Sequence, residues 1–179
     1  KVARMGMLNA LSQTTLKLLC PGVPDVYQGQ EMWDFSLVDP DNRRPVDYAR
    51  RRTLLAQIDA GGLPDIDETG AAKLLVVVQA LRLRRDRPEL FTGYTPLTAT
   101  GPAAGHVVAF DRGGAVAVAT RLPVRLAESG WWRDTALDVG SAPVRDVLTG
   151  RDFPGGSLPL ADLLAQYPVA LLVAEGGKP

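Results

Sequence analysis

The sequence predicts two parts of different fold class, an α/β part over residues 1–92 and an all-β part over residues 93–179. In the first part, long runs with apolar residues at helical spacing flank a single short apolar run, Val23–Tyr27. From Tyr94 onward, short apolar runs recur at regular spacing between Gly and Pro residues, which is typical of an antiparallel β-sandwich.

Three helices are expected in the first part, because apolar residues recur there about every three to four positions. We expect them at residues 2–19, 48–60 and 70–86. Pro21-Gly22 stops the first helix, Asp47 can cap the second, and Gly61-Gly62 ends it. The four residues Pro88–Phe91 are expected to form a single helical turn.

The one strand expected in the first part is Val23–Tyr27, a βα unit of a parallel sheet. A lone strand leaves both of its edges unpaired, so the sequence argues for neighbouring strands supplied by another segment. The chain also opens at Lys1 inside a helical pattern without an initiator Met. We therefore expect a truncated or processed N-terminus.

The second part is expected to hold seven short strands, and the boundary between the two parts falls near residues 92–94. A helical turn over Ala161–Gln166 is expected between the last two strands. The expected strands are Tyr94–Thr100, His106–Arg112, Ala115–Leu122, Thr135–Val139, Val144–Leu148, Ser157–Leu160 and Val169–Ala174.

Composition argues against several classes of function. Lys plus Arg and Asp plus Glu balance at 20 each, so a neutral chain has no general attraction to nucleic acid or to an anionic membrane. The longest apolar stretch, Leu74–Val78, is too short to span a bilayer. A single cysteine, Cys20, fits a reducing cytoplasm. His106 is the only histidine, and we expect no metal site and no cofactor.

The run Gly22-Val23-Pro24-x-x-Tyr27-Gln28-Gly29-x-Glu31 resembles the eighth barrel strand of the α-amylase superfamily of glycoside hydrolases. In that superfamily a (β/α)₈ TIM barrel is followed by an antiparallel β-sandwich. The resemblance thus implies that residues 1–92 are the last βα unit of the barrel and that residues 93–179 are the C-terminal sandwich domain.

The longer run Trp33-Asp34-Phe35-Ser36-Leu37-Val38-Asp39-Pro40-Asp41-Asn42-Arg43-Arg44-Pro45 is similar to one family in particular, the maltooligosyltrehalose synthases. Later runs such as His106–Phe110 and Pro168–Leu172 agree with the C-terminal end of that family. The resemblance covers nearly the whole chain and implies a C-terminal fragment of a larger enzyme.

The resemblance implies an intramolecular transglycosidase, an isomerase of trehalose biosynthesis. It converts the reducing-end α-1,4 linkage of a maltooligosaccharide into an α,α-1,1 linkage by retaining chemistry, with a carboxylate nucleophile and a carboxylic acid. In the family these carboxylates lie on earlier barrel strands. We therefore assign no catalytic residue here and expect this chain alone to be inactive. The implied partners are the maltooligosaccharide substrate and the upstream barrel segment.

The part of the site that this chain can supply is the loop after the strand, because loops at the carboxyl ends of barrel strands form the mouth of the site. This loop contains an aromatic ring that can stack on a sugar, carboxylates and an amide that can bind hydroxyl groups, and guanidinium groups that can bind a carboxylate. The expected substrate-binding residues are Trp33, Asp34, Asp41, Asn42, Arg43 and Arg44.

Structural roles for the same loop residues stay open. Arg43 or Arg44 can instead pair with Asp39 or Asp41 and only shape the loop, and Glu31 is expected to bind the loop backbone or neighbouring strand ends.

Two other functions remain as alternatives. The first is another hydrolase or transferase of the α-amylase superfamily, against which the specific loop sequence argues. The second is a stand-alone carbohydrate-binding module, against which residues 1–60 argue, because a free-standing module has no use for a single βα unit.

Overall fold

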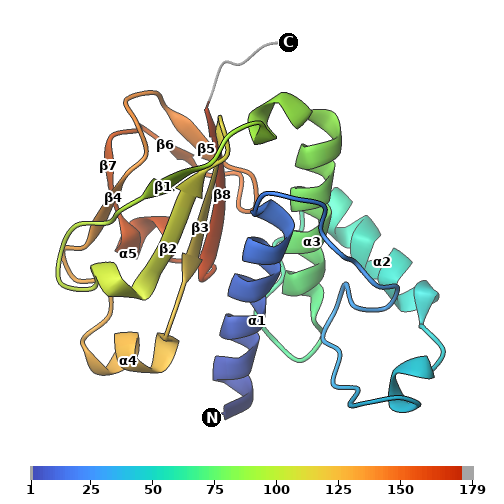
Figure 1. The fold of residues 1–179 in the computed structure, drawn as a ribbon. Helices are drawn as coiled ribbons and strands as arrows, with labels where there is room; N and C mark the ends of the chain where they lie inside the picture. Colours follow the sequence, from blue (N-terminus) through green and yellow to red (C-terminus); the bar gives the residue numbers. More distant parts are fainter. Residues whose placement is uncertain (1, 175–179) are drawn as a thin grey trace.

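The structure is a computed structural model that describes residues 2–174 and, at Asn42, the backbone alone. Helices α1, α2 and α3 gather on one side of the molecule and an antiparallel sheet lies on the other (Figure 1). The helices are α1 (Val2–Leu19), α2 (Tyr48–Asp59), α3 (Ala71–Asp86), α4 (Pro123–Glu128) and α5 (Leu160–Leu163), with short 3-10 helices at Asp41–Arg43, Pro88–Phe91 and Ala104–His106.

The main sheet has six strands, all paired antiparallel, in the order β1-β2-β3-β8-β5-β6. Its centre is the pair β3–β8, in which Val118 lies opposite Ala170. A separate ribbon pairs β4 with β7, with Leu137 opposite Leu158. The strands are β1 (Thr95–Leu97), β2 (Val107–Asp111), β3 (Ala115–Thr120), β4 (Ala136–Asp138), β5 (Val144–Asp146), β6 (Asp152–Phe153), β7 (Ser157–Pro159) and β8 (Val169–Ala174).

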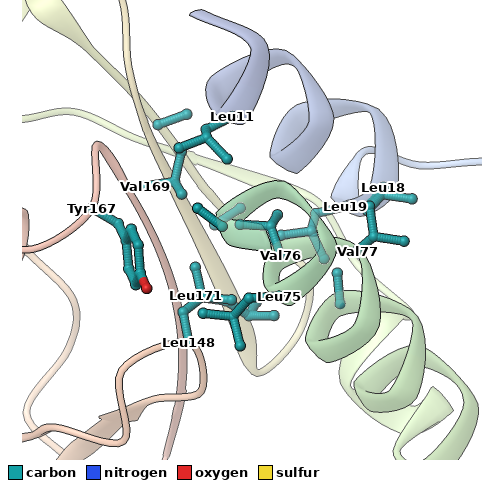
Figure 2. Packing of buried hydrophobic residues seen from close by; sticks show 14 of the residues in the cluster. Leu11, Leu18, Leu19, Leu75, Val76, Val77, Leu148, Tyr167, Val169 and Leu171 are labelled. Atoms are coloured by element: carbon teal, nitrogen blue, oxygen red, sulfur yellow. The ribbon is translucent and has the colours of Figure 1, made fainter. Parts of the chain in front are cut away.

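Helices α1 and α3 cover one face of this sheet. The apolar cluster there includes Leu11 and Leu18 of α1, Leu75 of α3, and Ala117 and Leu171 of the sheet. Figure 2 shows the leucines of α1 and α3 gathered with Leu171. β3 presents only alanines to this face, so α1 can approach the sheet closely.

The other face of the sheet is also buried. Val116 and Val118 of β3 and Leu172 of β8 pack there against Leu126 of α4 and Leu137 of the β4–β7 ribbon. Because successive side chains of a strand point to opposite faces, burial on both sides requires an uninterrupted apolar strand. All six residues of β3 are buried, which explains its sequence Ala-Val-Ala-Val-Ala-Thr.

The three long helices begin and end close to their expected positions. The Asp47 side chain accepts a hydrogen bond from the Arg50 N–H at 2.9 Å, which caps α2 as expected. Gly70 precedes α3 with a φ of 77°, a conformation that glycine adopts without strain. None of the helices in residues 2–174 is long and apolar enough to cross a membrane.

The expected strand Val23–Tyr27 does not form, and this prediction is wrong for the chain by itself. Residues 23–27 follow an extended path without regular structure, and Val23 is 96% exposed. Val26 and Tyr27 are also exposed. The reason is the missing partner: a strand is stabilised by ladder hydrogen bonds to its neighbours, and residues 2–174 supply none here.

The second half has the expected antiparallel sheet, but its second layer is smaller than a sandwich predicts. That layer is the two-stranded ribbon with α4 and α5 beside it. The sequence did not predict α4 or the two-residue strand β6, and the expected helical turn lies at Leu160–Leu163. The division at residues 92/93 stays a prediction, and the cluster under α1 and α3 contains residues from both sides of it.

Candidate functional site

The candidate site is the loop of residues 28–47, which runs from the extended segment to the start of α2. We call residues 28–31 and 46–48 the loop base, because the two ends of the loop meet there. Tyr48 donates its hydroxyl hydrogen to the Gln28 side-chain oxygen at 3.0 Å. A Cβ atom on Gly29 would lie 2.9 Å from a methyl carbon of Val46, so only glycine lets the ends approach this closely.

Arg51 of α2 binds both ends of the loop base. Its Nη2 donates to the Gly29 carbonyl oxygen at 2.5 Å, its Nε to the Glu31 carboxylate at 3.0 Å, and its Nη1 to the Asp47 carbonyl oxygen at 3.1 Å. The Arg51 and Glu31 side chains are 18% and 24% exposed. A guanidinium carries five donors in a rigid fork, which suits three acceptors at once.

Glu31 acts on the loop backbone, as the sequence suggested. Its carboxylate accepts from the Gly29 N–H at 3.3 Å and from Arg51. Burial alone raises the pKa of Glu31, but backbone N–H groups and the Arg51 guanidinium favour the charged form and hold its pKa below the usual value. Glu31 is therefore ionised at neutral pH and bound to the loop base.

Trp33 is anchored to the turn that precedes α3. Its indole N–H donates to the Asp67 carbonyl oxygen at 2.7 Å, and the half-buried ring packs against the apolar cluster formed by α1, α3 and the sheet. A Cβ atom on Gly70 would lie 2.8 Å from the backbone nitrogen of Trp33, so the residue before α3 is in close contact with Trp33. Lys73 adds a hydrogen bond to the Met32 carbonyl oxygen at 3.0 Å. Trp33 thus has a packing role, and its expected contact with a sugar stays a prediction.

Asp34 begins the outer part of the loop. One carboxylate oxygen accepts from the Ser36 N–H at 2.9 Å and from the Ser36 hydroxyl at 2.6 Å. These hydrogen bonds stabilise the charged form and lower the pKa of Asp34. The side chain is exposed and ionised at neutral pH. It can still accept a further hydrogen bond, because a carboxylate has two oxygens.

The two arginines of the expected site pair within the loop. The Arg43 Nε lies 2.5 Å from the Asp39 carboxylate, and Arg44 pairs with Asp41. The second oxygen of Asp41 accepts from the Leu37 N–H at 2.9 Å. The pairing that the sequence left open therefore occurs, although both arginine side chains are about three-quarters exposed.

The structure thus brings the six expected residues into one loop, but it gives most of them partners inside the chain. The side chain of Asn42 lies outside the described part, and its backbone belongs to the 3-10 helix. Within residues 2–174, no cluster of three or more His, Cys, Asp or Glu side chains could hold a metal ion. The contact with substrate stays a prediction for all six.

Sequence reasoning missed Arg51 and Lys73. Arg51 stands in the run Arg50-Arg51-Arg52, which has the appearance of a solvated helix face. Its charged partner lies 20 positions earlier, so no local spacing could reveal the pair. Lys73 contacts a carbonyl 41 positions away.

A groove of about 450 Å³ lies beside the loop base, between α2 and α3. Leu74, Val77 and Leu81 line it, together with Glu31 and several arginines of both helices. The polar groups of this groove are partly engaged already, since Glu31 binds Arg51 and Arg82 binds Asp59, and we assign no sugar site to it.

Known proteins of similar sequence and fold were found. A protein of Mycobacterium tuberculosis, provisionally named maltooligosyl trehalose synthase, is 48% identical over 170 residues, which is 93% of this chain. The chain spans about a fifth of the length of the curated relatives it matches, at 20%. No family model matches the sequence.

Solved structures give the same result. The structure of maltooligosyltrehalose synthase from Arthrobacter ramosus matches 96% of this chain with a TM-score of 0.94 and 59% identity, over 23% of its own chain. A structure described as DSM5389 glycosyltrehalose synthase matches 97% of this chain with a TM-score of 0.77 and 27% identity. In sequence and in fold, this chain therefore corresponds to the C-terminal part of the maltooligosyltrehalose synthases.

Proposed function

We propose that this chain is the C-terminal part of an enzyme that turns the reducing-end α-1,4 linkage of a maltooligosaccharide into an α,α-1,1 linkage. The observation that supports this most is the match to the Arthrobacter ramosus enzyme, with 59% identity and a TM-score of 0.94 over 96% of the chain. The enzyme type is an isomerase of trehalose biosynthesis acting as an intramolecular transglycosidase.

The chemistry proposed for the whole enzyme is that of a retaining glycosidase of the α-amylase superfamily. A carboxylate forms a covalent glycosyl intermediate, and the released glucose attacks it through its own anomeric hydroxyl before water does. We place these carboxylates in the segment that precedes this chain, which makes the chain inactive by itself. The loop acidic residues favour this view, because Asp34, Asp39 and Asp41 already bind groups within the loop.

The proposed place of residues 1–92 is the end of a (β/α)₈ barrel. The exposed residues Val23, Val26 and Tyr27 support this, because an apolar extended segment lacking strand partners is suited to pair with strands from elsewhere. In that arrangement the 28–47 loop follows a barrel strand and lies at the mouth of the site. Residues 93–179 would then form the C-terminal sandwich-type domain.

The proposed substrate contacts come from the outer part of the loop. Trp33 offers the exposed part of its ring, and Asp34, Asp41 and Asn42 offer hydrogen-bonding groups for sugar hydroxyls. Arg43 and Arg44 are largely exposed while paired to loop carboxylates.

The proposed location is the cytoplasm, which suits a chain with a single cysteine.

The test is a chimaera in which this chain replaces the matching C-terminal segment of the Arthrobacter ramosus enzyme. We expect the chimaera, incubated with maltohexaose, to remove reducing ends while chain length stays unchanged. The enzyme truncated before this segment and the chain alone are the controls, and both are expected to be inactive.

Other outcomes of the same assay identify the alternatives. Shorter chains with more reducing ends would contradict the isomerase and indicate a hydrolase of the same superfamily. A chimaera that folds, as shown by circular dichroism and gel filtration, but does not act would contradict the proposal. Binding of maltohexaose by the chain alone would then favour a carbohydrate-binding module.

A further inference from the structure

The 28–47 loop has two arms that are held in different ways. The first arm, up to Trp33, is fixed by two hydrogen bonds: the Trp33 indole donates to the Asp67 carbonyl in the turn before α3, and the Met32 carbonyl accepts from Lys73 of α3. The second arm, from Arg44 to Asp47, returns to α2. The position of the loop therefore depends on how the second arm is joined to the first.

That junction is made mainly by one side chain. Arg51 donates to Gly29 and Glu31 of the first arm and to Asp47 of the second. The contact between Tyr48 and Gln28 lies at the exposed edge of the same junction. The Arg51 side chain is less exposed than Tyr48. Its hydrogen bond to the ionised Glu31 carboxylate is also stronger than a hydrogen bond between two neutral groups.

The outer part of the loop is organised by its own contacts. Asp34 binds Ser36, Asp41 binds the Leu37 N–H, and Arg43 pairs with Asp39. The Asp41 N–H also donates to the Val38 carbonyl oxygen at 2.9 Å. This part can therefore move as one body, and its direction is set at the loop base.

We propose that Arg51 is the positioning residue of the 28–47 loop, holding its two arms together so that the outer part faces the substrate. This inference rests on the proposed function. Arg51 touches no reacting atom and acts through the loop. Lysine cannot replace it fully, because an ammonium group is a point charge without the planar fork that binds three acceptors in fixed directions.

Loop position matters in the second chemical step. The bond between the nucleophile carboxylate and C1 of the glycosyl group breaks as the anomeric hydroxyl oxygen of the bound glucose forms a bond to C1. The hydroxyl proton passes to the carboxylate that earlier protonated the leaving oxygen. If water attacks instead, its proton takes the same path, and the products are free glucose and an oligosaccharide one unit shorter. A displaced loop admits water and releases glucose.

The first measurement is hydrogen–deuterium exchange on the chain as it stands, comparing Arg51→Met with the matched control Arg52→Met on the same helix. Losing hydrogen bonds from a charged donor is expected to speed exchange of the loop base about tenfold or more. The control is expected to match the parent, because Arg52 is exposed and lies outside the junction. Equal exchange of the loop base in the two variants would overturn the proposal.

The second measurement places the same substitutions in the chimaera. Arg51→Met is expected to raise KM for maltohexaose about tenfold with a smaller change in kcat, and to raise the share of free glucose among products by a similar factor. Arg51→Lys should give intermediate values. A looser loop base with KM and product ratio equal to those of Arg52→Met would mean a purely structural role and would overturn the proposal.

The two measurements separate the failure of this inference from the failure of the proposed function. An unsubstituted chimaera without activity would contradict the proposed function. The exchange comparison on the chain alone would still decide whether Arg51 joins the two arms.

Discussion

At the scale of single residues, several buried or half-buried charged groups of this chain bind backbone. Arg51 joins the arms of a loop, and Arg112 and Asp146 serve similar ends elsewhere. Among residues 2–174, no buried side-chain nitrogen or oxygen lacks a hydrogen-bond partner. Each of these groups fixes segments that lie far apart in the sequence, so each is sensitive to substitution.

Asp146 at the end of β5 is 1% exposed. Its carboxylate accepts from the Leu171 N–H at 3.1 Å, the Leu148 N–H at 3.2 Å and the Thr149 hydroxyl at 2.6 Å. Burial raises the pKa of Asp146 in spite of these bonds. The native state therefore holds the proton more tightly than the unfolded chain, whose pKa is about 3.9. It follows that the unfolding free energy falls as pH rises from the unfolded pKa through the native one.

Asp146→Asn is expected to remove this pH dependence, since an amide keeps an acceptor for the two N–H groups without a charge. The unfolding free energy of the variant minus that of the parent should therefore increase as pH rises. Asp146→Ala should lose about 1–3 kcal/mol, because it leaves buried donors unpaired. Urea unfolding across pH measures both effects, and parallel pH curves for the parent and Asp146→Asn would contradict the account.

At the scale of elements, the sequence predicts well those helices and strands whose bounds are set by neighbouring residues. Helix α2 has its cap, Asp47, and its terminating glycines next to it, so its bounds were predictable. α4 is only six residues long, begins at Pro123, and follows Leu122 in a left-handed conformation, so its pattern is too short to read. The candidate loop could be found from its motif, but its junction at Arg51 could not, because Glu31 lies 20 positions away.

The end of α1 is another junction that no local pattern reveals. Arg112, 5% exposed, follows β2 and donates to the Leu19 carbonyl of α1, to the Phe91 carbonyl at 2.9 Å and to the Gly93 carbonyl at 2.7 Å. A cation at the C-terminus of a helix also complements the helix dipole. The guanidinium therefore joins α1 to the sheet and to the turn after α3.

Arg112→Met is expected to lower the unfolding free energy by about 3 kcal/mol, since three carbonyl groups lose a charged donor. The matched control is Arg125→Met on the exposed side of α4, expected to change stability by less than about 0.5 kcal/mol. Urea unfolding of both variants gives the comparison. A loss at Arg112 no larger than that at Arg125 would show that water replaces the guanidinium without cost.

At the scale of the whole molecule, the helices and the sheet share one apolar cluster, while residues 23–38 stay largely outside it. Val23, Phe35, Leu37 and Val38 are all more than three-quarters exposed. So many large apolar side chains on one connected segment are unusual for a free surface and mark a contact region. The segment that did not form a strand, residues 23–27, and the loop proposed to face substrate are therefore consecutive parts of one exposed apolar region.

This leads to a prediction about the strand itself. In the chain alone, the N–H groups of Val23 and of residues 25–27 lie outside any ladder in the described structure and should exchange within seconds to minutes. In the chimaera, pairing with barrel strands should add about 3 kcal/mol of local opening free energy, which slows exchange about a hundredfold. Residues 169–174 of the central strand β8 serve as the internal control, because each of them already pairs with β3 or β5 within this chain. If residues 23–27 exchange equally fast in both while β8 stays protected, the segment is not a barrel strand. The loop that follows it would then have no fixed place at the mouth of a site, even though the rest of the fold matches the family.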